Sequence, residues 1–321
     1  MNTKIWNPSQ QGWAGMLRAA ARQLEHDGRS AVARPLIEAL LDGGDVQTPL
    51  IDRADAHCLL SSIHLRQGAF EAAEEHARKA IELTEVCGDL EISSKALYAL
   101  GEVHYLNGAW RGQDSLEEAL DIHSKCLKLR EQIGDLGAQA ISLSRIGVIH
   151  ERLGNDEEAT ACYRRSVSLS AEAGSDECGS RSLIHLGGAE EEEGNLSAAL
   201  DYYERSVLAS RPNHDARSLT FDLCNVASVL ARLASDLRRA RRLLEEAEAI
   251  AKSMEWKLAM VRIAQVWGDV EWADGNLADA KAQYEKAGWI ADRYGFKGFE
   301  RVLQDRLSRL ADHEADVQGA S

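Results

Sequence analysis

The chain has 321 residues and a formal net charge of −15, with 45% hydrophobic and 28% charged residues. This acidic balance argues against a general nucleic-acid binder, which needs basic surface to displace the counterions of phosphates. No apolar window reaches 18 residues, the N-terminal segment lacks an apolar signal core, and the six cysteines form no CxxC pair. These features predict a cytoplasmic protein with reduced thiols, no direct nucleic-acid partner and no membrane segment.

The same sequence pattern recurs about every 40 residues along nearly the whole chain. Each unit carries apolar residues at helical spacing, then a small residue, then a second helical pattern. The small residue marks the predicted turn between two helices, because glycine adopts a positive φ without a steric penalty. The seven predicted turns are at Gly28, Gly68, Gly108, Gly154, Gly194, Ser235 and Gly275.

The units are not equally regular along the chain. The first, about residues 14–50, is degenerate because Pro35 falls early in its second helix. The other repeats run over about residues 54–290, and the turns at Gly108 and Gly154 stand 46 residues apart instead of 40. We place the surplus around Ala109–Asp114, between the two helices of the third unit. A capping helix and a tail, about residues 299–321, are expected to close the array.

Polar residues at the predicted helix ends support these boundaries. Three of the turns continue with an asparagine, which suits a turn or an N-cap: Asn155, Asn195 and Asn276. Three second helices end at a glycine that is followed closely by an aspartate able to cap the next helix. These pairs are Gly88 with Asp89, Gly134 with Asp135, and Gly174 with Asp176.

The placement of glycine, alanine and tyrosine resembles the tetratricopeptide repeat. Three copies carry the pattern: Ile146, Gly147, Gly154, Ala159 and Tyr163; Leu186, Gly187, Gly194, Ala199 and Tyr203; and Trp267, Gly268, Gly275, Ala280, Tyr284 and Ala287. The 40-residue period is similar to the repeats of kinesin light chains, of Pins-type spindle adaptors and of bacterial peptide-sensing regulators. The resemblance implies an all-α, right-handed superhelical solenoid of about seven antiparallel helical hairpins with a C-terminal capping helix, as a single domain over residues 1–321.

Three histidines, His64, His104 and His150, occupy the same position in the first helices of consecutive units. Equivalent positions in neighbouring repeats lie about 10 Å or more apart, whereas zinc ligands must each come within about 2.1 Å of one ion. We therefore expect packed, hydrogen-bonded imidazoles that share no metal, and the sequence predicts no cofactor.

Catalytic motifs for a nucleophile, a phosphate loop or a metal-dependent hydrolase do not occur in the sequence. His123 and Cys126 share a helix face at spacing i, i+3, yet both fall at positions where repeats pack together. The patterns favour a non-enzymatic role and predict no catalytic residue, although chemistry in the groove stays open.

The concave wall of a tetratricopeptide array is built from the first helix of each unit, as the resemblance implies. Groove positions in this chain hold many arginines and several aromatic side chains, which is typical of a binding hot spot. Carboxylates such as Asp55, Glu102 and Asp269 share these positions. The alternative is an ordinary amphipathic face whose arginines extend over their own helices. The predicted groove residues are Arg22, Arg66, Lys95, Tyr98, Tyr105, Ser144, Arg152, Arg181, Phe221, Arg232, Arg262 and Trp272.

A second basic cluster, Arg238, Arg239, Arg241 and Arg242, begins the second helix of its unit. Second helices face the convex side in the resembled family, so we expect a solvated surface with local acidic partners. The whole pattern predicts a non-enzymatic scaffold that binds a protein or peptide of acidic character in its concave groove. Two alternatives stay open: a bacterial intracellular regulator that senses a peptide or small metabolite, and a pathway-specific enzyme or substrate-holding protein. Homo-oligomerisation stays open as well.

Overall fold

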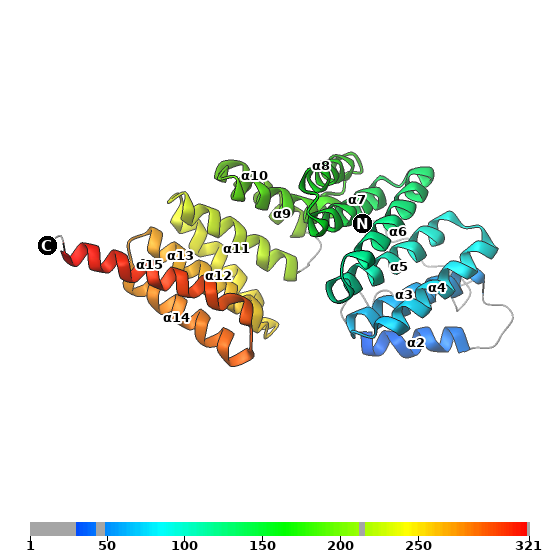
Figure 1. The fold of residues 1–321 in the computed structure, drawn as a ribbon, viewed down its shortest axis with the longest axis horizontal. Helices are drawn as coiled ribbons and strands as arrows, with labels where there is room; N and C mark the ends of the chain where they lie inside the picture. The colour runs from blue at the N-terminus through cyan, green and yellow to red at the C-terminus, as the bar shows by residue number, and fades with distance from the viewer. Residues whose placement is uncertain (1–29, 43–48, 212–215, 320–321) are drawn as a thin grey trace, which may run out of the picture. The chain divides into compact units, whose positions relative to one another are not determined.

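The computed structural model of the protein describes residues 30–42, 49–211 and 216–319 (Figure 1). These residues form fourteen α-helices and one 3₁₀ helix and contain no strand, so the predicted all-α repeat fold is confirmed. Their contacts group into two compact units, Met1–Ala173 and Gly174–Ser321, where the sequence predicts one repeat domain. None of the described helices combines the length and the apolar character that crossing a bilayer requires.

Unit 1 contains three helical hairpins, and α2 packs against the first of them. The predicted turn at Gly28 lies outside the described residues, and the helix α2 continues through Pro35. The helices are α2 Ser30–Asp42, α3 Leu50–Arg66, α4 Phe70–Cys87, α5 Leu90–Arg111, α6 Gln113–Ile133, α7 Leu136–Leu153 and α8 Asp156–Glu172. The pairs α3 with α4, α5 with α6, and α7 with α8 form the hairpins.

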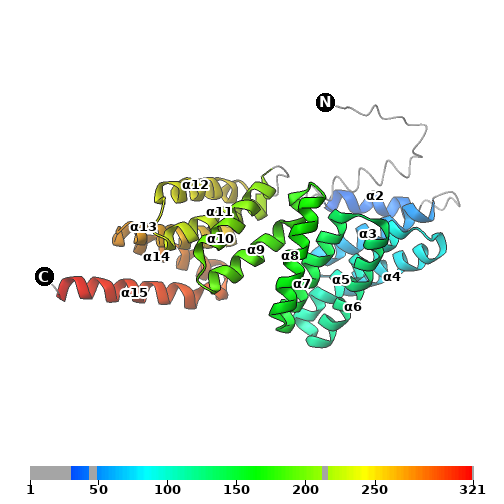
Figure 2. The same cartoon turned by 90° about the horizontal axis from the view of Figure 1, so that it is seen from above.

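Unit 2 also contains three hairpins, formed by α9 with α10, α11 with α12, and α13 with α14 (Figure 2). Its helices are α9 Asp176–Glu192, α10 Leu196–Ser210, α11 Ala216–Arg232, α12 Leu237–Ser253, α13 Lys257–Ala273, α14 Leu277–Tyr294 and α15 Glu300–Gly319. The short 3₁₀ helix Lys297–Phe299 precedes α15, which packs on α14 through the buried Leu303 and Leu310. This is the predicted capping helix, and it continues to Gly319 through most of the range expected for the helix and tail together.

Glycines in the left-handed region end the first helices of four hairpins, as predicted. Gly68, Gly154, Gly194 and Gly275 have φ between 73° and 82°, where a side chain would be strained. At the other end of the hairpins, the caps by Asp89 and Asp135 are also confirmed, because each carboxylate accepts a backbone N–H at 2.9 Å.

The predicted cap by Asp176 is wrong, because Ser175 is the N-cap residue and Asp176 is the first residue of α9. The asparagines after the turns occupy N-cap positions but use their side chains differently from a usual cap. Each side-chain amide bonds to a residue of the preceding helix: Asn155 to His150, Asn195 to Glu190 and Asn276 to Glu271. The asparagine therefore joins the two helices of a hairpin.

The predicted turn at Gly108 is wrong. Helix α5 continues through Gly108 to Arg111, and the chain reverses at Gly112, whose φ is 92°. A Cβ at Gly108 would lie 2.6 Å from Leu116 Cδ2, so this glycine lets α5 and α6 approach closely. The six surplus residues lengthen the two helices, which have 22 and 21 residues, and leave only a one-residue connection.

The hairpin of α11 and α12 makes its turn without glycine. Ala234 and Asp236 on either side of Ser235 adopt φ values of 48° and 36°. Such conformations cost non-glycine residues about 1–3 kcal/mol each. The Asp236 carboxylate accepts the backbone N–H of Arg239 at 3.1 Å and offsets part of this strain.

Three hairpins share a contact between a glycine of the first helix and a tyrosine of the second. A Cβ at Gly147 or Gly187 would lie 2.5 Å or 2.6 Å from the ring of Tyr163 or Tyr203. The tyrosine hydroxyls then donate to a carboxylate on the first helix, from Tyr163 to Glu151 at 2.6 Å and from Tyr203 to Glu191 at 2.9 Å. Burial and the adjacent carboxylate raise the pKa of each phenol, which keeps it a donor.

The third such contact, Gly268 against Tyr284, provides a test of this packing. Alanine at Gly268 is expected to lower the free energy of unfolding by about 1–3 kcal/mol, because its Cβ would press into a ring that is 1% exposed. The matched control is Gly288→Ala in α14, where a Cβ meets no atom within 4 Å. This change should stabilise the protein by about 0.5–1 kcal/mol. Urea unfolding measures both, and destabilisation by both variants would contradict the packing explanation.

Candidate functional site

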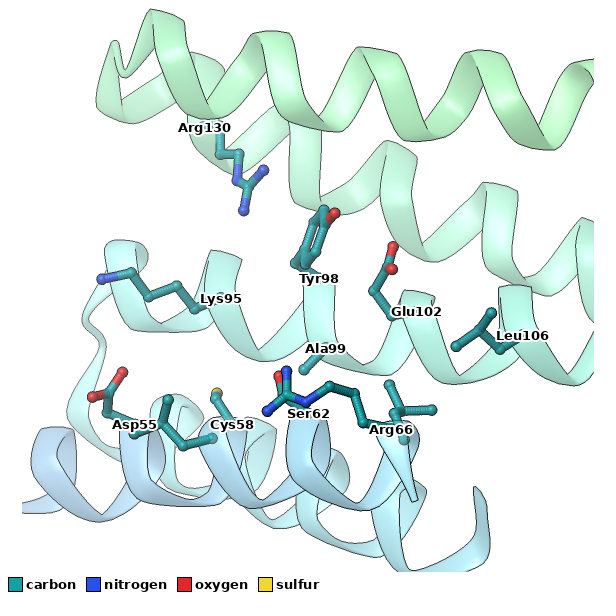
Figure 3. Close-up of a pocket in the computed structure, with 12 residues that line it drawn as sticks. Asp55, Cys58, Ser62, Arg66, Lys95, Tyr98, Ala99, Glu102, Leu106 and Arg130 are labelled. Carbon is teal, nitrogen blue, oxygen red and sulfur yellow. The ribbon is translucent and has the colours of Figure 1, made fainter. Parts of the chain in front are cut away.

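A pocket of about 520 Å³, called here the first pocket, opens on unit 1 between α3, α5 and α6 (Figure 3). Three of the predicted groove residues, Arg66, Lys95 and Tyr98, line it together. The structure therefore gathers these side chains from two successive first helices. The other lining residues are Asp55, Cys58, Leu59, Ser62, Leu65, Ala99, Glu102, Leu106 and Arg130.

Lys95 can exchange its partner at low energetic cost. Its Nζ lies 2.5 Å from Glu91 Oε1, and the two side chains are 35% and 66% exposed. An exposed ion pair of this kind contributes only about 0–1 kcal/mol. A ligand carboxylate arriving at the pocket can therefore compete with Glu91 for this ammonium group.

Arg130 is the charged residue of the first pocket that the sequence did not predict. It is 7% exposed, and its Nη1 donates to the Ala138 carbonyl and to Ser142 Oγ, both at 2.8 Å. Its guanidinium carbon lies 4.9 Å from the centre of the Tyr98 ring, and its Nε has no hydrogen-bond partner among the described groups. Figure 3 shows the guanidinium pointing from α6 toward the pocket. A buried cation on neutral acceptors makes the pocket attractive to anions.

The repeat register explains why Arg130 was missed. It lies in the last turn of α6, a second helix, whereas the resemblance assigns only first helices to the groove. The sequence around it carries no separate signal, because the feature that matters is its approach to Tyr98 on another helix.

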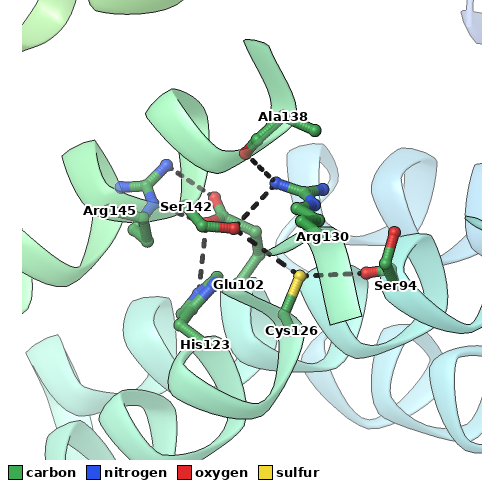
Figure 4. Close-up of polar contacts among 8 residues, drawn as sticks. All are labelled: Ser94, Glu102, His123, Cys126, Arg130, Ala138, Ser142 and Arg145. Atoms are coloured by element: carbon green, nitrogen blue, oxygen red, sulfur yellow. Dashed lines mark hydrogen bonds and ion pairs between the residues drawn. The ribbon is translucent and has the colours of Figure 1, made fainter. Parts of the chain in front are cut away.

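A buried ion pair lies beside the pocket (Figure 4). Arg145 Nη2 donates to Glu102 Oε2 at 2.7 Å, and its Nε lies 2.5 Å from Glu102 Oε1. His123 Nε2 lies 3.5 Å from the same Oε1, and burial with the nearby Arg145 and Arg130 lowers the pKa of His123 to about 3. The imidazole is therefore neutral at pH 7. Arg145 neutralises Glu102, so the Arg130 charge remains the local excess.

Cys126 and His123 do not form a catalytic pair. Burial raises the pKa of the Cys126 thiol and lowers that of His123, so neither group is ionised near neutrality. The Cys126 Sγ lies 3.1 Å from the Ser94 carbonyl oxygen, as Figure 4 shows. A nucleophilic cysteine needs the opposite shifts, toward thiolate and imidazolium.

Three further predicted groove residues, Tyr105, Ser144 and Arg152, lie in unit 1 but do not line the first pocket. Tyr105 is 7% exposed, and its ring centre lies 4.6 Å from the Arg145 guanidinium and 4.5 Å from that of Arg152. Ser144 is 4% exposed. Tyr105 and Arg152 therefore join α5 to α7, and only Arg152 of the three predicted residues is exposed.

Unit 2 has a pocket of about 570 Å³, called here the second pocket. Three predicted groove residues, Arg232, Arg262 and Trp272, line it together. Sequence reasoning missed the contribution of the capping helix, which supplies Arg306 and Arg309, because α15 lies outside the repeat register. The remaining lining residues are Glu191, Ser228, Ala231, Ala234, Asp269, Ala273, Tyr284 and Asp305.

Two other predicted groove residues do not line either pocket. Phe221 packs edge-on against Trp256, with ring centres 5.1 Å apart, and Arg181 is exposed on α9. Arg22 lies outside the described residues.

The three histidines at equivalent positions contact different partners. His64 stacks on His76 at a centroid distance of 5.3 Å, His104 Nδ1 lies 2.8 Å from Glu118 Oε2, and His150 contacts Asn155. Each ring therefore serves the packing of its own hairpin.

The basic cluster on α12 has the local acidic partners that the sequence suggested. Arg239 Nη1 lies 2.6 Å from Glu204, and Arg241 bonds to Glu271 and Asp274 on the α13 side. Arg241 therefore joins two hairpins. Arg238 is exposed, so it is the better position for a control substitution in binding experiments on unit 2.

Comparisons with known proteins agree with this architecture. Two family models described as tetratricopeptide repeat match residues 54–87 and 110–172. No curated protein matches the sequence. A STAND signal-transduction ATPase with a tetratricopeptide-repeat sensor, from Pyrococcus horikoshii, is similar at a TM-score of 0.66 and 17% identity, over 92% of this chain and 44% of that chain. The chain thus spans less than half the length of this similar structure.

Two Rap proteins are also similar in fold. The apo form of RapI has a TM-score of 0.56 and 13% identity, over 88% of this chain and 100% of that one. A Rap protein complexed with competence and sporulation factor has a TM-score of 0.54 and 12% identity, over 93% and 98% of the two chains. At these identities the likeness is one of fold. The sequence pattern, the hairpin packing and both family models therefore identify tetratricopeptide repeats in residues 54–87 and 110–172, within an all-α solenoid fold.

Proposed function

We propose that the protein is a binding scaffold whose first pocket anchors an acidic peptide segment of a partner. The observation that carries this proposal is Arg130, a buried cation that lines the pocket and whose hydrogen-bond acceptors, the Ala138 carbonyl and Ser142 Oγ, are neutral. Arg66 and Lys95 add positive charge at the same opening. A ligand carboxylate would form charge-assisted hydrogen bonds there, which contribute about 1.5–3 kcal/mol each.

The shape of the pocket favours a peptide side chain beside that carboxylate. Leu59, Leu65, Ala99 and Leu106 supply apolar surface, and the Tyr98 ring forms part of the wall. A volume of about 520 Å³ accommodates one or two side chains. The preferred segment therefore contains an aspartate or glutamate next to an apolar residue. The similar fold of a Rap protein complexed with competence and sporulation factor supports a binding role.

A selection of displayed random peptides on the full-length protein tests this proposal. Selected sequences are expected to be enriched in acidic residues next to apolar ones. Fluorescence anisotropy with one selected peptide should then show at least tenfold weaker binding for Arg66→Glu and for Lys95→Glu, about 1.4 kcal/mol each.

Matched charge reversals provide the control. Lys128→Glu on α6 and Arg164→Glu on α8 change exposed side chains that do not line the pocket, so affinity should stay within twofold. Equal losses in both sets would mean that only the net charge of the protein matters. Selected peptides without acidic enrichment would refute the proposed ligand.

A second candidate function is a regulator that senses a small ligand. The contribution of the capping helix to the second pocket favours it, because a ligand there would bridge α15 and the repeats.

A further inference from the structure

The second pocket contains two guanidinium groups held on one neutral oxygen. Gln265 is 2% exposed, and with its amide oriented to satisfy its neighbours, its side-chain oxygen accepts from Arg262 Nη1 and Arg306 Nη2, both at 3.2 Å. One arginine comes from α13 and the other from the capping helix α15. Two like charges this close are unfavourable unless an anion compensates both of them.

The carboxylates of the pocket compensate the arginines unequally. Asp269 receives Arg306 through both oxygens, at 2.6 Å and 3.1 Å, and also accepts the Tyr284 hydroxyl at 2.9 Å. Two other arginines of the pocket form ion pairs with carboxylates of the same pocket. Arg232 lies 2.7 Å from Glu191, and Arg309 lies 3.1 Å from Asp305.

Arg262 is the remaining cation. Among the described residues, no carboxylate forms an ion pair with it, and Arg262 lines the pocket. The arginines therefore exceed the carboxylates of the pocket by one, and the excess is at Arg262. The planar fork of a guanidinium matches a carboxylate in two parallel hydrogen bonds.

The indole ring of Trp272 belongs to a residue that lines the same pocket. Trp272, on α13 like Arg262, is half-buried, and its ring centre lies 6.5 Å from that of His313 on α15. A large planar ring binds well to planar apolar ligands, which stack in an offset arrangement. A volume of about 570 Å³ lies in the range of pockets that hold small organic molecules.

We propose that the second pocket binds a small organic anion, namely a carboxylate on a planar aromatic group, with the carboxylate on Arg262 and the ring against Trp272. This site lies in unit 2 and uses none of the residues of the first pocket, so it is independent of the proposed peptide binding. Because Arg306 and Gln265 share the hydrogen-bond network, a bound anion would also strengthen the link between α13 and α15.

Calorimetric titration of the full chain with 2-naphthoate tests the proposal, with the uncharged 2-naphthamide as a matched probe. We expect 2-naphthoate to bind at one site and the amide to bind at least tenfold more weakly. Arg262→Gln should weaken 2-naphthoate at least tenfold, and Trp272→Leu should weaken it several-fold. Arg238→Gln removes an exposed arginine of the same unit and should leave the affinity unchanged.

Several results would overturn the proposal. Equal binding of naphthoate and naphthamide would show that the site does not select an anion. Unchanged binding by Arg262→Gln would place the anion elsewhere. Inorganic phosphate that displaces naphthoate at equal concentration would show that the aromatic group contributes nothing. If Arg262→Gln fails to fold, the amide probe and Trp272→Leu still decide the matter. Peptide affinity measured on Arg262→Gln should be unchanged, which separates this site from the first pocket.

Discussion

Replacing Glu102 with glutamine is expected to lower the free energy of unfolding by about 3–5 kcal/mol, because it leaves a buried cation without its partner. The side chains of Arg145 and Glu102 are 10% and 18% exposed and form two close contacts. Burial alone would lower the pKa of Arg145, and Glu102 reverses this and raises it. Without the carboxylate, the charges of Arg145 and Arg130 would both stand beside the neutral His123.

Urea unfolding at pH 7 measures this effect, with Glu118→Gln as the control. Glu118 also pairs with a histidine, at 2.8 Å from His104, but its side chain is 63% exposed. The control should change stability by about 0–1 kcal/mol. Combining Glu102→Leu with Arg145→Met should recover much of the loss, since it removes both charges. A cost for Glu102→Gln no larger than that of Glu118→Gln would contradict this account.

Lowering the pH from 6.5 to about 4 is expected to destabilise unit 1 through a group of histidines between α3 and α4. His57 Nδ1 lies 2.9 Å from His76 Nδ1, and the His76 ring stacks on His64. Burial and the neighbouring histidine lower the pKa of His57 to about 4, and burial also lowers those of His64 and His76. Lys79 and Arg53 oppose protonation of His57, and the carboxylate of Glu75 favours it.

Around His64 and His76, too, basic side chains oppose protonation of the ring and acidic side chains favour it. Arg34 on α2 opposes protonation of His64 and His76, whereas Glu38 favours that of His64. The sign of the pH dependence follows from the lowered pKa values. Below pH 6.5 these histidines are protonated in the unfolded chain but still neutral in the folded chain. Falling pH therefore favours unfolding. The stability is fully present above pH 6.5 and is lost as the pH approaches 4. For His57 alone the loss amounts to about 3 kcal/mol, at about 1.4 kcal/mol for each pKa unit.

Unfolding free energies measured between pH 7 and 4 test this prediction. Carboxylates also take up protons near pH 4, so the informative quantity is the difference between variants. His57→Asn should flatten the curve above pH 4, and His313→Asn, which changes an exposed residue of α15, should not. Identical slopes for His57→Asn and the unmodified protein would rule out the histidine group as the cause.

Local features of the sequence were enough to predict the repeat architecture. The turns at Gly68, Gly154, Gly194 and Gly275 follow from the preference of glycine for positive φ, and the caps by Asp89 and Asp135 from hydrogen bonds three residues apart. These interactions join neighbours in the chain, so their signals can be read directly. The resemblance assigned Arg66, Lys95, Tyr98, Arg232, Arg262 and Trp272 to one groove, and the structure gathers the first three in one pocket and the last three in another.

Contacts between distant residues decided what the local signals left open. Gly108 stands at the repeat position of the turn glycines, yet the chain turns at Gly112 instead. Glycine is needed at 108 because Leu116 on the facing helix leaves no room for a side chain. Arg130 reaches Tyr98 from a second helix, and Arg306 reaches Asp269 from the capping helix, outside the repeat register. The periodic spacing of residues in the sequence predicts which face of its own helix each residue occupies. Which charges meet across helices, and which of them remains uncompensated, depends on packing that only the tertiary structure contains.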